Sequence, residues 1–144
     1  MTEVRIVNTS SNQLPQYESV GASGLDIRAN LAEPIELGVF EIKLIPTGLF
    51  IELPEHLEAQ IRPRSGLALK SGITVLNSPG TIDSDYRGEI GVILINLGTQ
   101  KITINNGDRI AQLVVCPIEK IKWDNVLCIS ETERNSKGFG STGI

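Results

Sequence analysis

The apolar segments of this chain are short, because glycine and proline interrupt them at close intervals. The sequence holds 14 glycines and 7 prolines among 144 residues. Several segments alternate polar and apolar residues, as in 40–44 and 118–122, and this period of two is typical of a half-buried strand. Many short strands separated by turns favour a sandwich, a jelly roll or a barrel. We therefore predict an all-β domain.

The same pattern predicts one short helix, in a chain whose length fits a single domain. The helix is expected near Gly66–Ser71 with about two turns, because Gly66 and Gly72 bound this stretch. No internal repeat or low-complexity linker divides the chain. The predicted strands are Glu3–Val7, Phe40–Pro46, Leu49–Leu53, Glu58–Pro63, Ile90–Asn96, Lys101–Ile104, Arg109–Val115 and Ile118–Trp123.

The last stretch, residues 131–144, differs in composition from the rest of the chain. It contains Gly138, Gly140 and Gly143, one aromatic residue and almost no aliphatic side chain. Such a segment cannot bury enough apolar area to order itself. We expect a β domain over residues 1–130, followed by a flexible glycine-rich arm that either stays disordered or orders on a ligand.

Charge and hydropathy exclude several classes of partner. The formal net charge is −4, which argues against binding to duplex nucleic acid. No apolar run approaches the roughly 20 residues that cross a bilayer, and residues 1–10 lack the apolar core of a signal peptide. We expect a cytoplasmic protein with no membrane or nucleic-acid partner. A small anion can still bind where positive charge is local or supplied by a metal.

The cysteines and the single histidine offer little chemistry. Cys116 and Cys128 follow apolar neighbours, so we expect two small buried thiols. His56 follows Pro54-Glu55 in a predicted turn, and no nucleophile stands near it in the sequence. We expect a surface histidine and no Ser/His/Asp triad. Trp123 is expected in the core or in an interface.

The run from Asn77 to Ile90 carries the most informative cluster, with three carboxylates and one arginine between apolar strands. Asp83 follows the apolar Ile82, from which we expect partial burial. A partly buried carboxylate beside a water can act as a general base. The alternative interpretation is a solvated turn whose charges are incidental.

The segment Arg62-Pro63-Arg64-Ser65-Gly66 forms a second cluster. Amides at a helix start, a hydroxyl and a guanidinium together suit an anion, and Gly66 lets a backbone approach a ligand closely. The alternative is that Ser65 simply caps the helix.

The arm has its own binding chemistry. Arg134, Lys137, two hydroxyls and amides exposed by glycine suit phosphate oxygens, and Phe139 between glycines is free to stack on a base. The spacing of Gly138, Gly140 and Gly143 matches a dinucleotide fingerprint, but the required strand–helix context is missing. The alternative is a plain flexible end.

Taken in order, five segments resemble the motifs of the homotrimeric deoxyuridine triphosphate nucleotidohydrolases, the dUTPases. The resemblance implies a distorted jelly-roll or β-barrel subunit with one short helix. It further implies a homotrimer whose active sites each draw on three subunits, with the arm of one closing over a site. The segments are Ala22–Ile27, Pro63–Gly66, Asn77–Gly88, Gly107–Leu113, and Arg134 with Gly138–Gly143.

The resemblance also implies an activity. Such an enzyme cleaves dUTP to dUMP and pyrophosphate with Mg²⁺, which limits uracil incorporation into DNA and supplies dUMP for dTMP synthesis. Asp83 matches the carboxylate that activates water for attack on the α-phosphorus. Asp26 matches an acid that contacts the metal through water, and the remaining metal ligands are substrate phosphates.

The substrate contacts carry over by position. Tyr86 matches the ring that packs on deoxyribose and excludes a 2′-hydroxyl. The hairpin that reads uracil corresponds to Asn77, Thr81, Ile82, Ile90 and Gly91. Phosphate contacts correspond to Arg64, Ser65, Gly66 and Gln112. In the arm, Arg134, Gly140, Ser141 and Thr142 correspond to contacts with the outer phosphates, and Phe139 to the stacking lid.

The departures from the family pattern are mild, since Leu25 stands where the family often has an aromatic residue. Two alternatives stay open. A dCTP deaminase shares the fold but needs a differently placed acid and lacks the complete arm motif. A non-catalytic nucleotide-binding regulator would not require Asp83, Tyr86 and the arm together.

Overall fold

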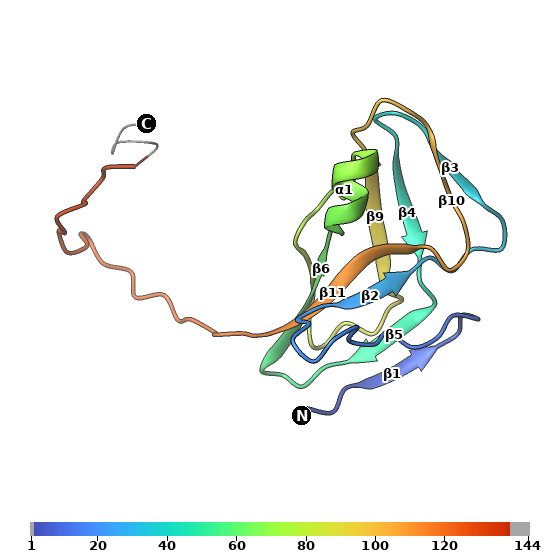
Figure 1. Ribbon diagram of the computed structural model, residues 1–144. Helices are drawn as coiled ribbons and strands as arrows, with labels where there is room; N and C mark the ends of the chain where they lie inside the picture. Colours follow the sequence, from blue (N-terminus) through green and yellow to red (C-terminus); the bar gives the residue numbers. More distant parts are fainter. Residues whose placement is uncertain (1, 139–144) are drawn as a thin grey trace.

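The computed structural model describes residues 2–138, and within them the chain forms eleven strands and one helix (Figure 1). The strands are β1 (Arg5–Asn8), β2 (Leu25–Arg28), β3 (Ile35–Leu37), β4 (Ile42–Pro46), β5 (Leu49–Glu52), β6 (Leu57–Arg62), β7 (Ile73–Val75), β8 (Gly80–Ile82), β9 (Gly91–Asn96), β10 (Ile102–Ile104) and β11 (Arg109–Pro117). The helix is α1 (Ser65–Ser71). The prediction of an all-β domain with one short helix is confirmed.

All strand pairs are antiparallel. Most strands pair with a strand that is distant in the sequence and not with the next strand along the chain. One sheet has the order β2-β11-β6-β8, a second has the order β4-β9-β7, and the pairs β1-β5 and β10-β3 complete the body. Long connections between paired strands are a property of jelly rolls. This topology brings the start and the end of the β domain together, because β2 lies beside β11.

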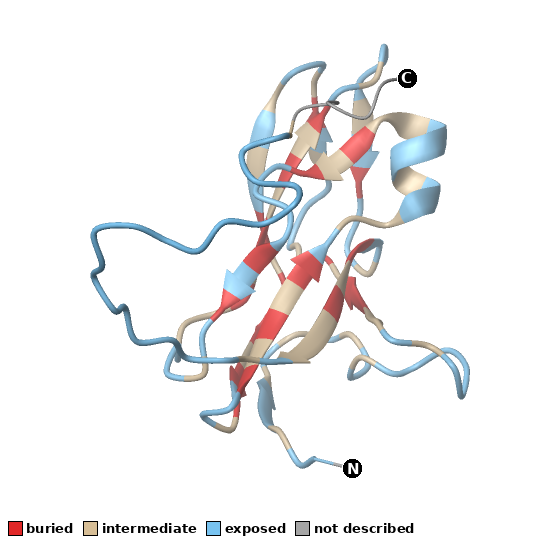
Figure 2. Ribbon diagram, turned by 90° about the vertical axis from the view of Figure 1, so that its left-hand side faces the viewer, coloured by how far each residue is buried: buried red, intermediate tan, exposed pale blue. Residues whose placement is uncertain are grey.

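Alternation places the core on one face of each strand. In β6, Leu57, Ala59 and Ile61 are buried, while the residues between them are partly exposed. Figure 2 shows the same alternation along neighbouring strands. Fully burying a Leu or Ile side chain stabilises a fold by about 1.5–3 kcal/mol, so the pattern fixes which face of the sheet turns inward. The outward face of β2-β11-β6-β8 carries the polar side chains of β6 together with Val114 and Cys116 of β11.

Helix α1 is the only helix within the described residues, and it begins one residue earlier than predicted. Its C-terminal cap is Gly72 in the left-handed conformation, with φ of 68°, so the predicted glycine boundary is confirmed. Arg64, and not Ser65, is the N-cap residue, and no side chain caps the helix. No helix within residues 2–138 is long and apolar enough to cross a membrane.

One predicted strand is wrong. Residues Ile118–Trp123 alternate polar and apolar side chains, yet they form no strand. A strand needs a partner as well as a pattern, and within residues 2–138 this segment has none. Beyond β11 the chain runs away from the body without regular structure (Figure 1), and the Trp123 side chain is 85% exposed. Trp123 is therefore not part of this chain's core.

The expected burial of the two thiols is also wrong. Cys116 is only partly buried and Cys128 is exposed. Cys116 lies near the end of β11, and Cys128 lies on the segment that leaves the body, so apolar neighbours in sequence did not imply apolar neighbours in space. His56 is exposed in a turn, as predicted.

Candidate active site

A buried carboxylate bridges two arginines near one end of β6. Asp26, on β2, is 9% exposed. Its Oδ1 accepts from Arg64 Nε at 2.9 Å, and its Oδ2 accepts from an Arg109 guanidinium nitrogen at 3.2 Å. Arg64 also donates to the Arg109 carbonyl oxygen at 3.3 Å. We call Asp26, Arg64 and Arg109 the arginine cluster. A buried carboxylate is costly unless it is paired, so these contacts fix the orientation of both guanidinium groups.

The strand register places more polar groups beside the arginine cluster. Gln112 on β11 pairs with Asp26 on one side and with Arg62 of β6 on the other, and paired residues point to the same face of a sheet. Ser65 and Gly66, both exposed, begin α1 directly after Arg64. A Cβ at Gly66 would meet nothing within 4 Å in this chain, so space around that backbone is open for a ligand. The result is an outward surface with guanidinium, amide and hydroxyl donors.

The second group of predicted residues lies on the segment from Asn77 to Gly91, which we call the hairpin segment. Its strand β8 pairs with β6, with Thr81 opposite Gln60 and Ile82 opposite Ala59. Ile82 is buried and Asp83, the next residue, is exposed. The predicted partial burial of Asp83 is therefore wrong, because successive side chains of a strand point to opposite faces.

Asp83 and Tyr86 belong to one turn. Asp83 O accepts from Tyr86 N at 3.1 Å, and Arg87 donates to the carbonyl oxygens of Ser84 and Tyr86 at 2.6 and 3.0 Å. No hydrogen bond among residues 2–138 uses the carboxylate of Asp83. That carboxylate borders a hollow of about 450 Å³ that is also lined by the acidic residues Glu55, Glu58 and Asp85 and by Lys120.

Ile90 and Asn77, two of the predicted contacts to the base, differ in whether their hydrogen-bonding groups are free. Ile90 N donates to Leu49 O at 2.8 Å and Ile90 O accepts from Thr47 Oγ1 at 2.6 Å, so the N–H of Ile90 is not free for a ligand. Asn77 is exposed in the turn before β8, and its side-chain amide is available to a base.

Asp26 and Asp83 lie near opposite ends of β6. Asp26 is level with Arg62 across β11, whereas Asp83 directly follows the residue paired with Ala59. Between Asp26 and Asp83 there are three strand spacings and about four residues of strand, which correspond to roughly 20 Å. Residues that act on the same phosphate group cannot stand that far apart. One chain therefore does not assemble all the predicted contacts.

The described part of the arm does not reach either group. Arg134 Nε donates to Lys137 O at 3.0 Å, and Lys137 N donates back to Arg134 O at 3.0 Å. This turn lies well away from the β body in Figure 1. Phe139, Gly140, Ser141 and Thr142 lie outside the described residues.

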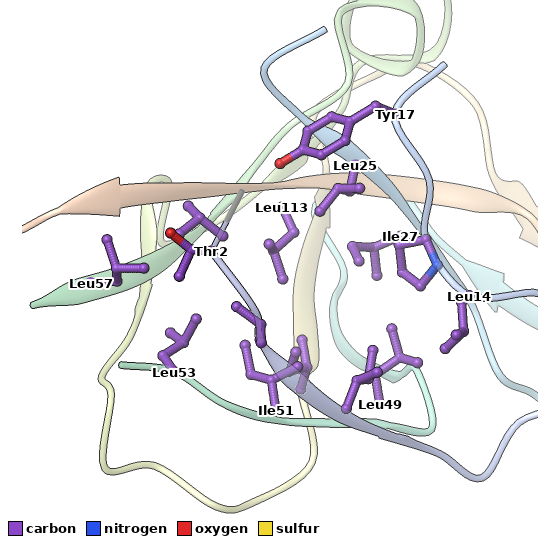
Figure 3. Close-up of a pocket in the computed structure, with 15 residues that line it drawn as sticks. Thr2, Leu14, Tyr17, Leu25, Ile27, Leu49, Ile51, Leu53, Leu57 and Leu113 are labelled. Carbon is purple, nitrogen blue, oxygen red and sulfur yellow. The ribbon is translucent and has the colours of Figure 1, made fainter. Parts of the chain in front are cut away.

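A cavity lined mainly by apolar side chains is a poor candidate for this chemistry. Its volume is about 560 Å³, and it lies between β1, β5, β2 and β11. Figure 3 shows leucine and isoleucine side chains such as Leu49, Ile51 and Leu113 around it, with few polar atoms among them. A triphosphate needs cationic and hydrogen-bonding partners, so we assign the candidate site to the polar groups at the ends of β6.

The donor set permits only an indirect metal contact. Within residues 2–138, no group of three or more His, Cys, Asp or Glu side chains could hold a metal ion. Asp26 is engaged by two guanidinium groups, but a carboxylate has about four lone-pair sites, and Oδ1 has only one partner. The cluster thus fits a hydrated hard cation whose other ligands come from a substrate.

Sequence reasoning overlooked one member of this arrangement. Arg109 lies in the fourth motif but received no predicted role. Arg109 could have been recognised as an ion-pair partner of Asp26 by its opposite charge, but only if the pairing of β2 with β11 had been known. Glu89 was also overlooked, although it stands inside the hairpin segment.

Comparison with known proteins identifies the fold and its relatives. The family model for dUTPase matches residues 10–143. The deoxyuridine 5′-triphosphate nucleotidohydrolase of Cytophaga hutchinsonii is 57% identical over 142 residues, which cover 99% of this chain and 92% of the relative. The enzyme of the same name from Bdellovibrio bacteriovorus is 52% identical over 141 residues, or 98% and 95% of the two chains.

Solved structures give the same result. The dUTPase of Staphylococcus bacteriophage 80alpha, described with dUPNHPP, aligns with a TM-score of 0.90 and 25% identity, and all of both chains is covered. A mutant dUTPase from phage phi11 of S. aureus aligns with a TM-score of 0.80 at 22% identity over 90% of this chain and 100% of the other. That structure is described as revealing the coordination of a structural Mg(II) ion.

Proposed function

This chain belongs to the dUTPase family and hydrolyses dUTP, and we propose that Asp83 is the residue that activates the attacking water. The exposed Asp83 carboxylate has no partner among the described side chains, so its lone pairs are free to accept a water proton. The water oxygen attacks the α-phosphorus, the bond to the bridging oxygen breaks, and pyrophosphate leaves with dUMP as the other product. A general base must have an acceptor oxygen that is free to take the proton of the attacking water, and Asp83 has one.

The hairpin segment reads the base and the sugar. Asn77 offers an exposed amide to uracil, and the backbone at Gly91, Ile82 and Thr81 surrounds the same loop. The N–H and the carbonyl oxygen of Ile90 already bond to Leu49 and Thr47, so Ile90 contributes to the base pocket by shaping it and not by a free N–H. Tyr86, 46% exposed, packs its ring on the deoxyribose and leaves no room for a 2′-hydroxyl. A site shaped against one hydroxyl discriminates by steric exclusion.

The other end of β6 binds the phosphates. Arg64 is aimed by Asp26, and Ser65 and Gly66 add a hydroxyl and an open backbone. Gln112, on the same face, contributes a side-chain amide. In this arrangement a rigid guanidinium meets phosphate oxygens without first having to be ordered, which lowers the cost of binding.

Magnesium is the cation that this site would take. Asp26 would contact it through a water molecule, and the phosphate oxygens would supply the direct ligands. Bound there, Mg²⁺ would offset part of the triphosphate charge. The protein's own task is to hold the Asp26 carboxylate in a fixed orientation, which its hydrogen bonds to Arg64 and Arg109 do.

The complete site is shared between copies in a homotrimer. The main support is the separation of roughly 20 Å between Asp26 and Asp83 in one chain. Further support comes from the segment after β11, where Ile121, Trp123, Val126 and Ile129 are exposed. Side chains of this size are usually covered in a stable protein, and a second copy can cover them.

Residues 131–144 act as an arm that closes the site. Arg134, Ser141 and Thr142 contact the outer phosphates, Gly140 brings its backbone close to them, and Phe139 stacks over the base. The described part of the arm supports this role by its exposure, because none of its charged side chains is committed to the β body. We place the activity in the cytoplasm and expect no nucleic-acid partner, in keeping with the net charge of −4.

Mixed oligomers test the shared site directly. Asp83→Asn chains and Arg64→Ala chains are each expected to be inactive alone. After co-refolding in equal amounts, junctions that combine Asp83 of one mutant with Arg64 of the other regain both groups. Random mixing gives about one quarter intact junctions, so pyrophosphate release from dUTP should recover to roughly that fraction.

The control is an equal mixture of wild-type chains and double-mutant chains that carry both Asp83→Asn and Arg64→Ala. This mixture contains the same number of wild-type Asp83 and Arg64 side chains as the mixture of single mutants, so its pyrophosphate release is the reference activity. If the two single mutants show no recovery although mass spectrometry confirms mixed trimers, the site lies within one chain and the proposal is wrong.

A further inference from the structure

The carboxylate of Glu89 ties the hairpin segment to a turn of the β body. One oxygen, Oε1, accepts from Thr47 N at 3.1 Å and from Gly48 N at 2.7 Å. These two residues form the connection between β4 and β5. An ionised acceptor makes shorter and stronger hydrogen bonds than a neutral one. Glu89 therefore holds two backbone groups at once.

The turn that Glu89 grips is itself fixed. Thr47 is 1% exposed, and Gly48 has φ of 70°, a left-handed conformation. A Cβ at Gly48 would lie 2.8 Å from Ser10 Cβ, so this position of the turn requires glycine both for its φ and for its close contact with residue 10. A group that is hydrogen-bonded to the amides of Thr47 and Gly48 is therefore held at a fixed position relative to the core.

Further bonds extend this attachment along the hairpin segment. Thr47 Oγ1 donates to Ile90 O at 2.6 Å and accepts from Leu49 N at 3.2 Å, and Ile90 N donates to Leu49 O at 2.8 Å. Residues 89 and 90 are thus bonded to residues 47–49 through both side chain and backbone. We call this set of contacts the hairpin clamp.

Tyr86 is positioned through the clamp. Its hydroxyl donates to Glu89 O at 3.0 Å. An ideal Cβ at Gly88 would lie 2.2 Å from that hydroxyl oxygen, so the tyrosine occupies the space that any larger residue at position 88 would need. The Tyr86 ring therefore rests on the backbone of residues 88 and 89, and it moves if that backbone moves.

We propose that Glu89 is a positioning residue for sugar selectivity, which holds the hairpin segment so that the Tyr86 ring stands against the 2′ carbon of the bound sugar. This inference rests on the proposed role of Tyr86. The carboxylate acts through the backbone of residues 88–90 and touches no substrate. Loss of the clamp loosens the ring and admits a ribonucleotide.

The test compares kcat/KM for dUTP with kcat/KM for UTP. In Glu89→Ala the ratio should fall on the order of tenfold, because hydrogen bonds to a charged group are lost, mainly through a higher KM for dUTP and a lower KM for UTP. Glu89→Gln keeps an acceptor oxygen at the same reach and should restore most of the ratio. Glu89→Asp is shorter and should give an intermediate ratio, and it replaces Glu89→Ala if that variant does not fold.

A matched control is available in Glu41. Its Oε2 accepts from Gly38 N at 2.7 Å in the connection between β3 and β4, so Glu41→Ala also removes a carboxylate from a turn amide. This variant should leave the dUTP to UTP ratio unchanged. Equal losses of selectivity in Glu41→Ala and Glu89→Ala would mean that general loosening of the fold is responsible, and the inference would be overturned.

Tyr86→Ala distinguishes the proposed role of Tyr86 in the site from the positioning role of Glu89. If this variant keeps the wild-type ratio, the proposed role of Tyr86 is wrong whatever Glu89 does. If Tyr86→Ala loses selectivity while folded Glu89→Ala and Glu89→Asp keep it, the proposed function stands and the positioning role of Glu89 fails.

Discussion

The two ends of β6 hold functional groups in opposite ways. At the arginine cluster, side chains fix one another: Asp26 is buried and bonded to Arg64 and Arg109. At the hairpin segment, backbone contacts do the positioning and the Asp83 carboxylate is left without a described partner. The comparison indicates that the phosphate end is built to be rigid in its charges, whereas the end that performs the proposed proton transfer keeps its acid uncommitted.

Replacement of Asp83 should give the largest effect on turnover and almost none on folding. Asp83→Asn removes the general base, and the loss of such a group reduces kcat by about 10²–10⁴-fold. Because the side chain is exposed and unbonded, the free energy of unfolding should change by less than about 0.5 kcal/mol. Steady-state pyrophosphate release and urea unfolding measure the two quantities. A folded Asp83→Asn enzyme with wild-type kcat would show that another group activates the water.

Removal of the arm should come next in size. A chain ending at residue 133 loses the predicted contacts of Arg134 and Phe139 but none of the strands. We expect a trimer by sedimentation, an unchanged far-ultraviolet spectrum, and kcat/KM lower by on the order of 100-fold, because closure over the substrate is lost. Full activity of this truncated trimer would mean that the arm is not needed for dUTP hydrolysis and that the groups at the two ends of β6 are sufficient.

Asp26 should show the reverse of Asp83, with a marked effect on folding. Asp26→Asn leaves two guanidinium groups beside a neutral amide. Breaking a buried pair costs about 3–5 kcal/mol, but Arg64 and Arg109 are 25% and 43% exposed, so solvent reduces the loss to about 2 kcal/mol. Urea unfolding measures the change in stability, and KM for dUTP should rise as Arg64 loses its orientation.

Arg5→Gln supplies the control for this prediction. Arg5 pairs with Glu52 at 3.4 Å on the surface, where an ion pair contributes at most about 1 kcal/mol. Equal, small losses of stability in both variants would contradict the view that the arginine cluster is the rigid end.

Much of the fold followed from the sequence, because alternation marks half-buried strands. Three of the four shortest strands within residues 2–138 were missed: β3, β7 and β8 have three residues each, too few to display a period. β10 has the same length but was found within the predicted strand Lys101–Ile104. β2 was missed because Asp26 and Ile27 are both buried, which breaks the alternation, and the burial of Asp26 depends on arginines distant in sequence. Residues Ile118–Trp123 show the converse error, since their pattern is that of a strand but pairing is not local.

The candidate site was less accessible to sequence reasoning than the fold. Its residues were found through their resemblance to family motifs, but their arrangement at two ends of β6 follows from strand register, which no motif states. The exposure of Asp83 was within reach, because a buried Ile82 places its neighbour on the other face. The roles of Arg109 and Glu89 required contacts between segments more than 40 residues apart.

The smallest expected effect belongs to Glu41, a carboxylate away from both ends of β6. The N–H of Gly38, and then Lys43, hold the pKa of Glu41 below its ordinary value of 4.5. A lowered pKa stabilises the fold fully above the unfolded value, and this contribution is lost as pH falls through the folded value. The stability difference between wild type and Glu41→Gln should therefore be small and constant above pH 4.5 and shrink below it, with kcat unchanged. Urea unfolding at stepped pH measures this difference. A difference that grew on acidification would mean that protonated Glu41 is the form the turn prefers, and carboxylate capping would then be a poor account of Glu89 as well.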